Sequence, residues 1–151
     1  MALFSNPART FFSREEGRQI VDAIQAAEQN TSGEIRLHLE NKVRKGQTVI
    51  QQAGKAFDRL GMYDTEQRNG VLIFMAVEDH KFAIIADEGI NKVVPENFWN
   101  DIAALMSAKF KEKAFVAGLS EGIQLIGEKL QEFFPYQTDD INELPDDISF
   151  G

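Results

Sequence analysis

The chain has 151 residues, no cysteine and a formal net charge of −8, from 16 basic and 24 acidic residues. This length suits one domain, and the lack of cysteine excludes disulfides, cysteine-ligated metal sites and thiol catalysis. The acidic balance argues against a nucleic-acid partner. No stretch is long and apolar enough for direct insertion into a membrane, and the first residues lack the basic-then-apolar order of a signal peptide. We therefore expect a cytoplasmic protein.

The first half of the chain predicts two helices and a strand between them. Ser13 and Glu16 have the spacing of a capping box, which begins a helix over 13–29. Apolar and polar residues alternate over 34–41, which is typical of a strand with one buried face. Helical spacing then returns over 47–60 and ends at a glycine.

The second half begins with two strands. Residues 71–77 form an uninterrupted apolar run, which indicates a central strand covered on both faces. Asp79 and His80 are placed for a tight reversal, and residues 81–87 return antiparallel. Residues 90–94 are apolar enough for a short strand or a packed loop.

Two C-terminal helices complete the pattern. Pro95 suits the first turn of a helix that runs through Phe110, and a further helix ends before Pro135. A strand, a helix and a second strand in succession predict a parallel pair with a right-handed crossover. We therefore expect a three-layer α/β/α sandwich over residues 1–135. Its small mixed sheet would combine a β-α-β unit with an antiparallel hairpin.

Residues 136–151 differ from the rest, since they hold five acidic residues and no basic one, with apolar residues interspersed. They are expected to form an acidic C-terminal tail separate from the 1–135 domain. Three interpretations stay open: a segment that folds back onto the domain, a short docking peptide, or a mobile terminus.

Several short motifs resemble one known family. They are Thr31-Ser32-Gly33-Glu34-Ile35 before the first strand, Arg68-Asn69-Gly70-Val71-Leu72-Ile73 at the central strand, and the hairpin segment DHKFAIIADEG over 79–89. Together with glycines at 118 and 122 in the last helix, these motifs in this order resemble the TPM domain family. That family includes thylakoid-lumen acid phosphatases, photosystem II repair factors and many bacterial proteins.

The resemblance implies an α/β/α sandwich and a phosphatase-like or divalent-cation site. It also implies work in membrane-protein maintenance, so that the partner would be a membrane-associated protein. Many relatives have a Gly-rich turn after the third strand, whereas this chain has Asp87-Glu88-Gly89 there.

The predicted topology also brings polar residues together without reference to any family. If the first two strands are parallel, the residues before them lie at one sheet edge, and the third strand returns to that edge. Carboxylate, amide and hydroxyl oxygens suit Ca²⁺ or Mg²⁺, and an arginine there can hold a phosphate oxygen. The predicted ligand-binding residues are Ser32, Glu34, Arg68 and Asn69, and the predicted metal ligands are Asp64, Asp87 and Glu88.

A structural interpretation competes with this one, because turns commonly use Asp, Asn, Gly and Ser for backbone reasons. His80, at the hairpin tip, is a candidate general base or a solvated side chain. His38 is expected on the outward face of its strand. There is no Walker loop, G-x-G-x-x-G, G-x-S-x-G elbow or EF-hand loop. Any catalytic residue therefore stays unidentified.

Two functional hypotheses follow. The first is an accessory domain that works through protein contacts, modulated by a divalent cation at the edge of Asn69 and Asp87. The second is a metal-assisted phosphomonoesterase. Most of the 12 phenylalanines are expected in the core, with Trp99 a candidate for a partner-binding surface. Lysines 109, 111 and 113 are expected to form a solvated helix junction.

Overall fold

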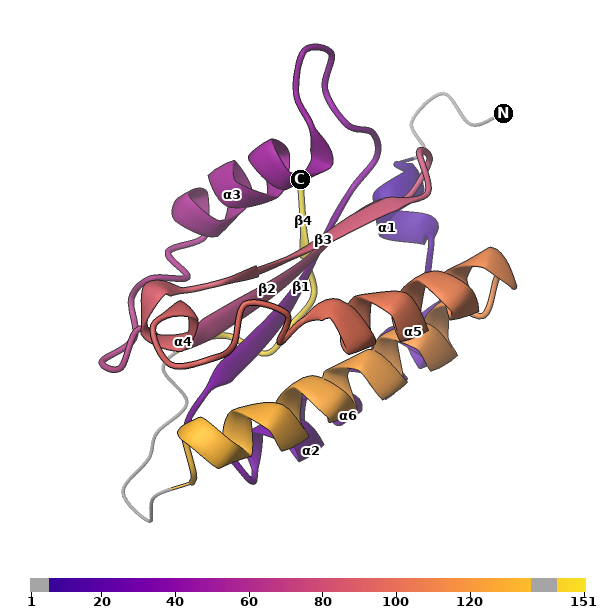
Figure 1. Ribbon diagram of the computed structural model, residues 1–151. Coiled ribbons are helices and arrows are strands. Elements are labelled where there is room, and N and C mark those ends of the chain that lie inside the picture. Colours follow the sequence, from indigo (N-terminus) through magenta and orange to yellow (C-terminus); the bar gives the residue numbers. More distant parts are fainter. Residues whose placement is uncertain (1–5, 137–143) are drawn as a thin grey trace.

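The structure, a computed structural model, describes residues 6–136 and 144–151. Figure 1 shows one mixed sheet with helices around it. In chain order the elements are α1 (Pro7–Thr10), α2 (Arg14–Glu28), β1 (Glu34–Glu40), α3 (Val49–Arg59), β2 (Gly70–Ala76), β3 (Lys81–Ala86), α4 (Glu88–Asn91), α5 (Asn100–Lys111), α6 (Phe115–Phe133) and β4 (Ser149–Phe150).

The strand order is β3-β2-β1-β4. β1 and β2 are parallel, with Glu34 opposite Gly70, while β2 and β3 form an antiparallel hairpin. The predicted mixed α/β fold, with its parallel pair and its hairpin, is therefore confirmed. The strand order itself was not predictable, and β4 was not foreseen.

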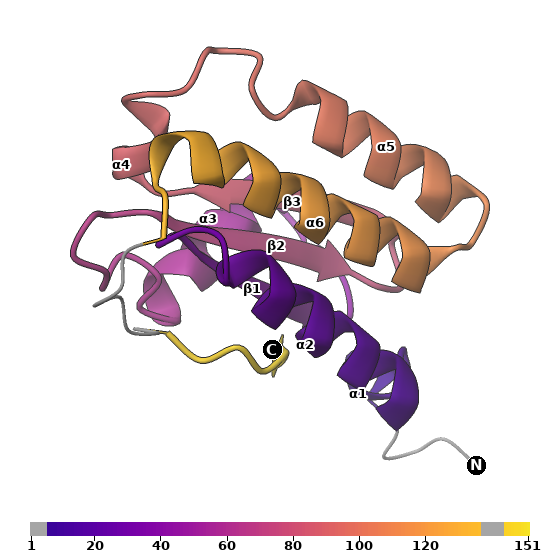
Figure 2. The ribbon, with the colours of Figure 1, turned by 90° about the horizontal axis from the view of Figure 1, so that it is seen from below.

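Helices cover the two faces of the sheet unequally. The side chains of Ile35, Leu37 and Leu39 pack in one cluster with α2 and α6, and Figure 2 shows α5, α6 and α2 side by side on this face. Leu72 and Phe74 belong to a second cluster with α3 on the other face. Because side chains alternate along a strand, β2 serves both clusters and is buried throughout.

Local capping explains where the first long helices begin. Ser13 accepts from the Glu16 amide at 3.1 Å while the Glu16 carboxylate accepts from the Ser13 amide at 2.9 Å, so the predicted capping box is confirmed. Thr48 and Gln51 make the same reciprocal pair at the start of α3.

Three local predictions are wrong in detail. The reversal after β2 is a four-residue turn over 77–80 rather than a tight Asp-His turn. Residues 88–91 form a helical turn, α4, because the Asp87 side chain accepts from the Glu88 amide. Pro95 does not open α5, since residues 95–99 form turns with a Phe98-to-Pro95 backbone bond of 3.0 Å.

β1 was also expected to leave one face to water, and this is wrong. Only 1% of His38 and 4% of Glu40 is exposed. Two segments cover this side of β1: Gln52 and Arg59 of α3 donate to Glu40, and Ser149 and Phe150 of the C-terminal segment pair in parallel with His38 and Leu39. No helix in the described residues is long and apolar enough to cross a membrane.

Candidate functional site

The candidate site lies where β1 and β2 begin. The Glu34 amide donates to the Asn69 carbonyl at 3.3 Å, and the Asp87 amide donates to the Gly70 carbonyl at 3.0 Å. Three chain segments, before β1, before β2 and after β3, therefore meet at one sheet edge, as the topology predicted. We call this region, with Ser32, Glu34, Arg68, Asn69 and Asp87, the β-edge site.

Arg68 and Asp87 form the strongest ionic contact of the β-edge site. Arg68 Nε donates to Asp87 Oδ2 at 2.7 Å and Nη2 donates to Oδ1 at 2.9 Å, a bidentate pair. Only 5% of the Asp87 side chain is exposed, against 41% of the Arg68 side chain. The hydrogen bonds from Arg68 therefore compensate a buried carboxylate.

Glu88 joins this pair from the solvent side. Its Oε1 accepts from Arg68 Nη1 at 3.2 Å, and its side chain is 55% exposed. The hydrogen bond with Asp87 raises the pKa of Arg68; burial, the next largest effect, opposes the rise, and the charges of Asp87 and Glu88 add to it. The arginine stays charged at every working pH.

Asn69 and Ser32 form the second part of the β-edge site. Asn69 Nδ2 donates to Ser32 Oγ at 3.3 Å, and Gln67 Nε2 donates to the same oxygen at 3.2 Å. Asn69 is 1% exposed, and its Oδ1 has no hydrogen-bond donor among the described residues. A buried acceptor without a donor is costly, which makes this oxygen the notable atom of the site.

The predicted metal ligands are arranged less favourably. Asp64 is exposed, whereas Asp87 and Glu88 are both bound to Arg68. Within residues 6–136 and 144–151, no group of three histidine, aspartate or glutamate side chains is placed to hold a metal ion. The metal role of Asp64, Asp87 and Glu88 stays a prediction.

Two carboxylates lie at the start of β1: Glu34, a predicted ligand-binding residue, and Glu28, which no sequence pattern singled out. Glu34 Oε1 accepts from the Leu144 amide at 2.8 Å, and Glu28 Oε2 accepts from the Ile35 amide at 2.8 Å. Burial raises the pKa of Glu28 to about 9, and a hydrogen bond with Asp146 adds to the rise. Glu28 is therefore protonated at neutral pH, and no periodicity in the sequence signals this.

A buried polar network at the other end of β1 was also missed. His38 Nδ1 lies 2.7 Å from Ser149 Oγ and Nε2 lies 2.9 Å from Glu40 Oε2, while Gln52 and Arg59 also donate to Glu40. Burial lowers the pKa of His38. Burial alone would raise the pKa of Glu40, but hydrogen bonds from His38 and Gln52 leave it lowered. A neutral imidazole therefore donates to Glu40, accepts from Ser149 and fastens β4 to β1.

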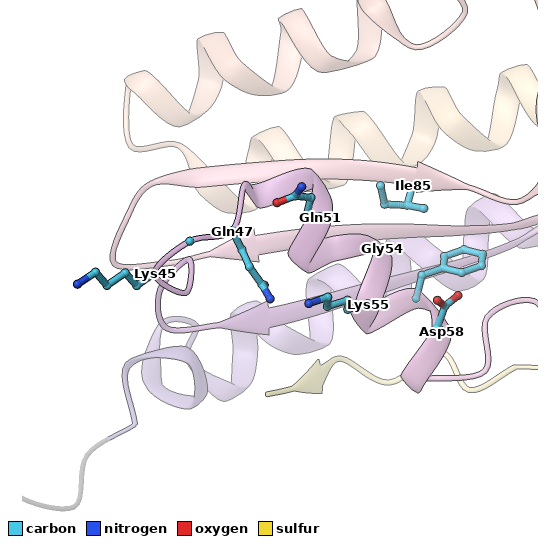
Figure 3. A pocket seen from close by; sticks show the side chains of 9 residues that line it. Lys45, Gln47, Gln51, Gly54, Lys55, Asp58 and Ile85 are labelled. Carbon is cyan, nitrogen blue, oxygen red and sulfur yellow. The ribbon is translucent and has the colours of Figure 1, made fainter.

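A hollow on the α3 face is separate from the β-edge site. It has a volume of about 720 Å³ and is lined by polar and charged side chains over Phe57 and Ile85. Figure 3 shows the side chains of Lys45, Gln51 and Lys55 spread along its rim rather than directed at one point. The hollow therefore offers no converging set of groups for chemistry.

Trp99, the candidate for a partner-binding surface, packs against the core. Trp99 is half-buried and packs edge-on against Phe98, with ring centroids 4.8 Å apart. It contributes to the edge of the main core rather than standing clear of it.

Comparison with known proteins supports the motif-based resemblance. The profile of the TPM domain matches residues 6–129. The NMR structure of the BA42 protein from the psychrophilic bacterium Bizionia argentinensis is 44% identical, with a TM-score of 0.88 and full coverage of both chains. No curated protein matches the chain significantly.

Two distant structures show the same fold. The N-terminal domain of a P. gingivalis protein is 14% identical, with a TM-score of 0.64 and coverage of 83% of this chain and 82% of its own. The N-terminal domain of the cg2496 protein from Corynebacterium glutamicum is 10% identical, with a TM-score of 0.61 and coverage of 95% and 90%. With the profile match and the 44% identical structure, these findings show that the chain belongs to the TPM domain family.

Proposed function

We propose that the protein is a non-catalytic accessory domain that binds a divalent cation, Ca²⁺ or Mg²⁺, at the β-edge site and a protein partner beside it. The single observation that carries the proposal is Asn69 Oδ1, a buried amide oxygen without a donor among the described residues. A cation, with water completing its shell, would satisfy this acceptor.

The chemistry around Asn69 suits a hard cation. The Ser32 hydroxyl lies beside the amide, and Glu34 follows in the neighbouring strand. Ca²⁺ and Mg²⁺ prefer oxygens of this kind, and Mg²⁺ commonly keeps several waters. Asp87 would act indirectly, by holding Arg68 away from the amide oxygen, and a direct metal role for Asp87 would require Arg68 to release it.

An NMR titration tests the cation. Protein freed of metal with a chelator is titrated with Ca²⁺ and then with Mg²⁺ while backbone amide shifts are followed. We expect saturable shifts centred on Ser32, Asn69 and Gly70, which Asn69→Ala abolishes. Asn30→Ala, at an exposed asparagine just after α2, is the matched control and should titrate like the natural protein. A titration without shifts at the β-edge site would end the proposal.

The partner would be a membrane-associated protein, as the family resemblance implies. We expect intact protein to capture such a partner from a detergent extract in a cation-dependent way. Asn69→Ala should lose the cation dependence and Asn30→Ala should keep it. If the partner is captured equally well without the cation and by the Asn69→Ala variant, the partner does not bind at this site.

Arg68 favours a second candidate function, a metal-assisted phosphomonoesterase. Its guanidinium is partly exposed while Asp87 holds it in place, an arrangement suited to a phosphate oxygen. The test is hydrolysis of p-nitrophenyl phosphate with and without Ca²⁺ or Mg²⁺. Activity that is unchanged in Asp87→Ala and Arg68→Gln variants would remove the β-edge site from such a reaction.

A further inference from the structure

An aromatic cavity lies at the end of β2 opposite the β-edge site. It has a volume of about 250 Å³ and lies between the β2–β3 turn and the α5–α6 turn, which are on the same side of the molecule in Figure 1. Met75 and Val77 form its floor. We call it the hairpin cavity.

Four phenylalanine rings from distant parts of the chain form the walls. The ring centroids of Phe82 and Phe110 are 5.1 Å apart, those of Phe110 and Phe115 are 5.6 Å apart, and those of Phe115 and Phe11 are 4.9 Å apart. All four side chains are only half-buried. They form a continuous aromatic surface that the described residues leave open, which suits a flat apolar group.

The rim of the hairpin cavity is basic. Lys81, Lys111 and Lys113 line it together with His80, and no acidic residue does so among those described. None of these lysines forms an ion pair within the described part of the chain. The basic side chains therefore line the cavity itself, while the neighbouring acidic residues Glu78, Asp79 and Glu112 do not line it.

The backbone at the rim is held in an unfavourable conformation. His80 has φ of 54° and Lys113 has φ of 62°, the left-handed region that residues with a Cβ rarely adopt. The two residues belong to the two turns that bound the cavity. At Lys113 this conformation closes the end of α5, since the Lys113 amide donates to the Phe110 carbonyl at 3.0 Å and the Ala114 amide donates to the Lys109 carbonyl at 2.9 Å. The backbone at this part of the rim is therefore fixed by main-chain hydrogen bonds.

We propose that the hairpin cavity binds a small amphipathic anion, with a flat aromatic body between the phenylalanines and a carboxylate, sulfonate or phosphate among the lysines. Apolar walls with a few polar groups at one side are the usual composition of small-molecule sites. The modest volume limits the body to one ring or two fused rings. The ligand class is independent of the cation proposed at the β-edge site.

Calorimetry and amide NMR with two probes of equal size test the charge requirement. The anionic probe is 2-naphthoate and the neutral probe is 2-naphthol. We expect naphthoate to bind with shifts at His80, Phe82 and Phe115, and to bind about tenfold more tightly than naphthol, the effect expected of partly exposed charges. Equal affinity for both probes, shifts elsewhere, or no binding of naphthoate at millimolar concentration would overturn the proposal.

Variants separate the rim from the walls. The double variant Lys81→Gln/Lys111→Gln should weaken naphthoate about tenfold and leave naphthol within about twofold. Lys55→Gln, an exposed lysine on the α3 face, is the control and should change neither. Ser107→Met adds volume at the lining and should weaken both probes, with thermal unfolding confirming that it folds. If naphthoate binds the rim variant and the lining variant as tightly as the natural protein, the hairpin cavity is not its binding site.

Discussion

The two ends of β2 differ in what surrounds them: backbone atoms at the start and side chains at the end. At Gly70 the strand begins among backbone atoms, since the Asp87 amide donates to the Gly70 carbonyl and the Gly89 amide donates to the Arg68 carbonyl at 2.9 Å. At Met75 and Val77 it ends beside a cavity lined by side chains. The first end has little freedom to move because main chain packs on main chain, whereas the second can adapt through its side chains.

Left-handed residues mark both ends but are held differently. Arg68 has φ of 53° and is tied by its bidentate pair with Asp87. His80 and Lys113, at the other end, have no ion pair within the described residues. The left-handed backbone is therefore accompanied by a side-chain ion pair at the β-edge site, whereas at Lys113 it is accompanied by backbone hydrogen bonds that close the end of α5, from the Lys113 amide to the Phe110 carbonyl at 3.0 Å and from the Ala114 amide to the Lys109 carbonyl at 2.9 Å.

The largest expected effect is that of Gly89→Ala at the rigid end. An added Cβ would overlap the Gln67 carbonyl oxygen and lie 2.6 Å from that of Arg68, both of them backbone. We expect the free energy of unfolding to fall by about 3 kcal/mol in urea titrations. Gly54→Ala in α3 is the control, since its Cβ would meet nothing within 4 Å, and it should gain about 0.5–1 kcal/mol. A loss at Gly89 below about 1 kcal/mol would show that this end is not rigid.

Glu28→Gln tests the carboxylates beside the β-edge site through pH. Because folding raises the pKa of Glu28 from 4.5 to about 9, folding takes up a proton between these values, and stability falls as pH rises through that window. Glutamine is neutral at every pH and can still accept from the Ile35 amide. The variant should therefore gain about 2 kcal/mol of unfolding free energy at pH 8 and little at pH 4.

The control for this charge effect is Glu132→Gln, at an exposed position near the end of α6. We expect its unfolding free energy to follow that of the natural protein within about 0.5 kcal/mol from pH 5 to pH 9. A Glu28→Gln difference that does not change with pH would refute a proton taken up at Glu28.

Gly118→Ala tests the end of β2 at the hairpin cavity, where side chains can adapt. Its Cβ would lie 2.8 Å from the Phe110 ring and 3.0 Å from Lys109 Cβ, so the ring at the cavity wall must move. The cost of overpacking is partly offset by the better helix propensity of alanine, and we expect a net loss of about 1 kcal/mol. The informative measurement is the comparison with Gly89→Ala: equal losses would remove the distinction between the two ends.

The smallest expected effect is a gain in stability for the Lys113→Gly variant. Glycine relieves the left-handed strain at φ 62° but loses more chain entropy on folding, which leaves a net gain of about 0.5 kcal/mol. Thermal unfolding measures the gain. Naphthoate affinity should fall in the same variant, because one rim charge is removed. A variant that is less stable would show that Lys113 makes a contact worth more than its strain.

Local signals predicted much of the fold because they act within one element. The Ser13–Glu16 capping box, the alternation around Leu37 and the long apolar run of β2 each specify a structure by short-range stereochemistry. The convergence of Ser32, Asn69 and Asp87 was also predictable, since parallel strands joined by one crossover begin at the same edge. The bidentate ion pair between Arg68 and Asp87 was not predictable, because side-chain pairing depends on rotamers and on exact spacing.

By itself the sequence determined the order of the long helices and of the first three strands, the parallel pair with its hairpin, and the family resemblance that the comparisons confirm. Only the tertiary structure decided what covers β1, where four phenylalanines meet, and that Glu28 is protonated. The physical reason is distance along the chain. Periodicity and capping act over a few residues, whereas burial, pKa and cavity shape arise from side chains more than a hundred residues apart in the case of His38 and Ser149.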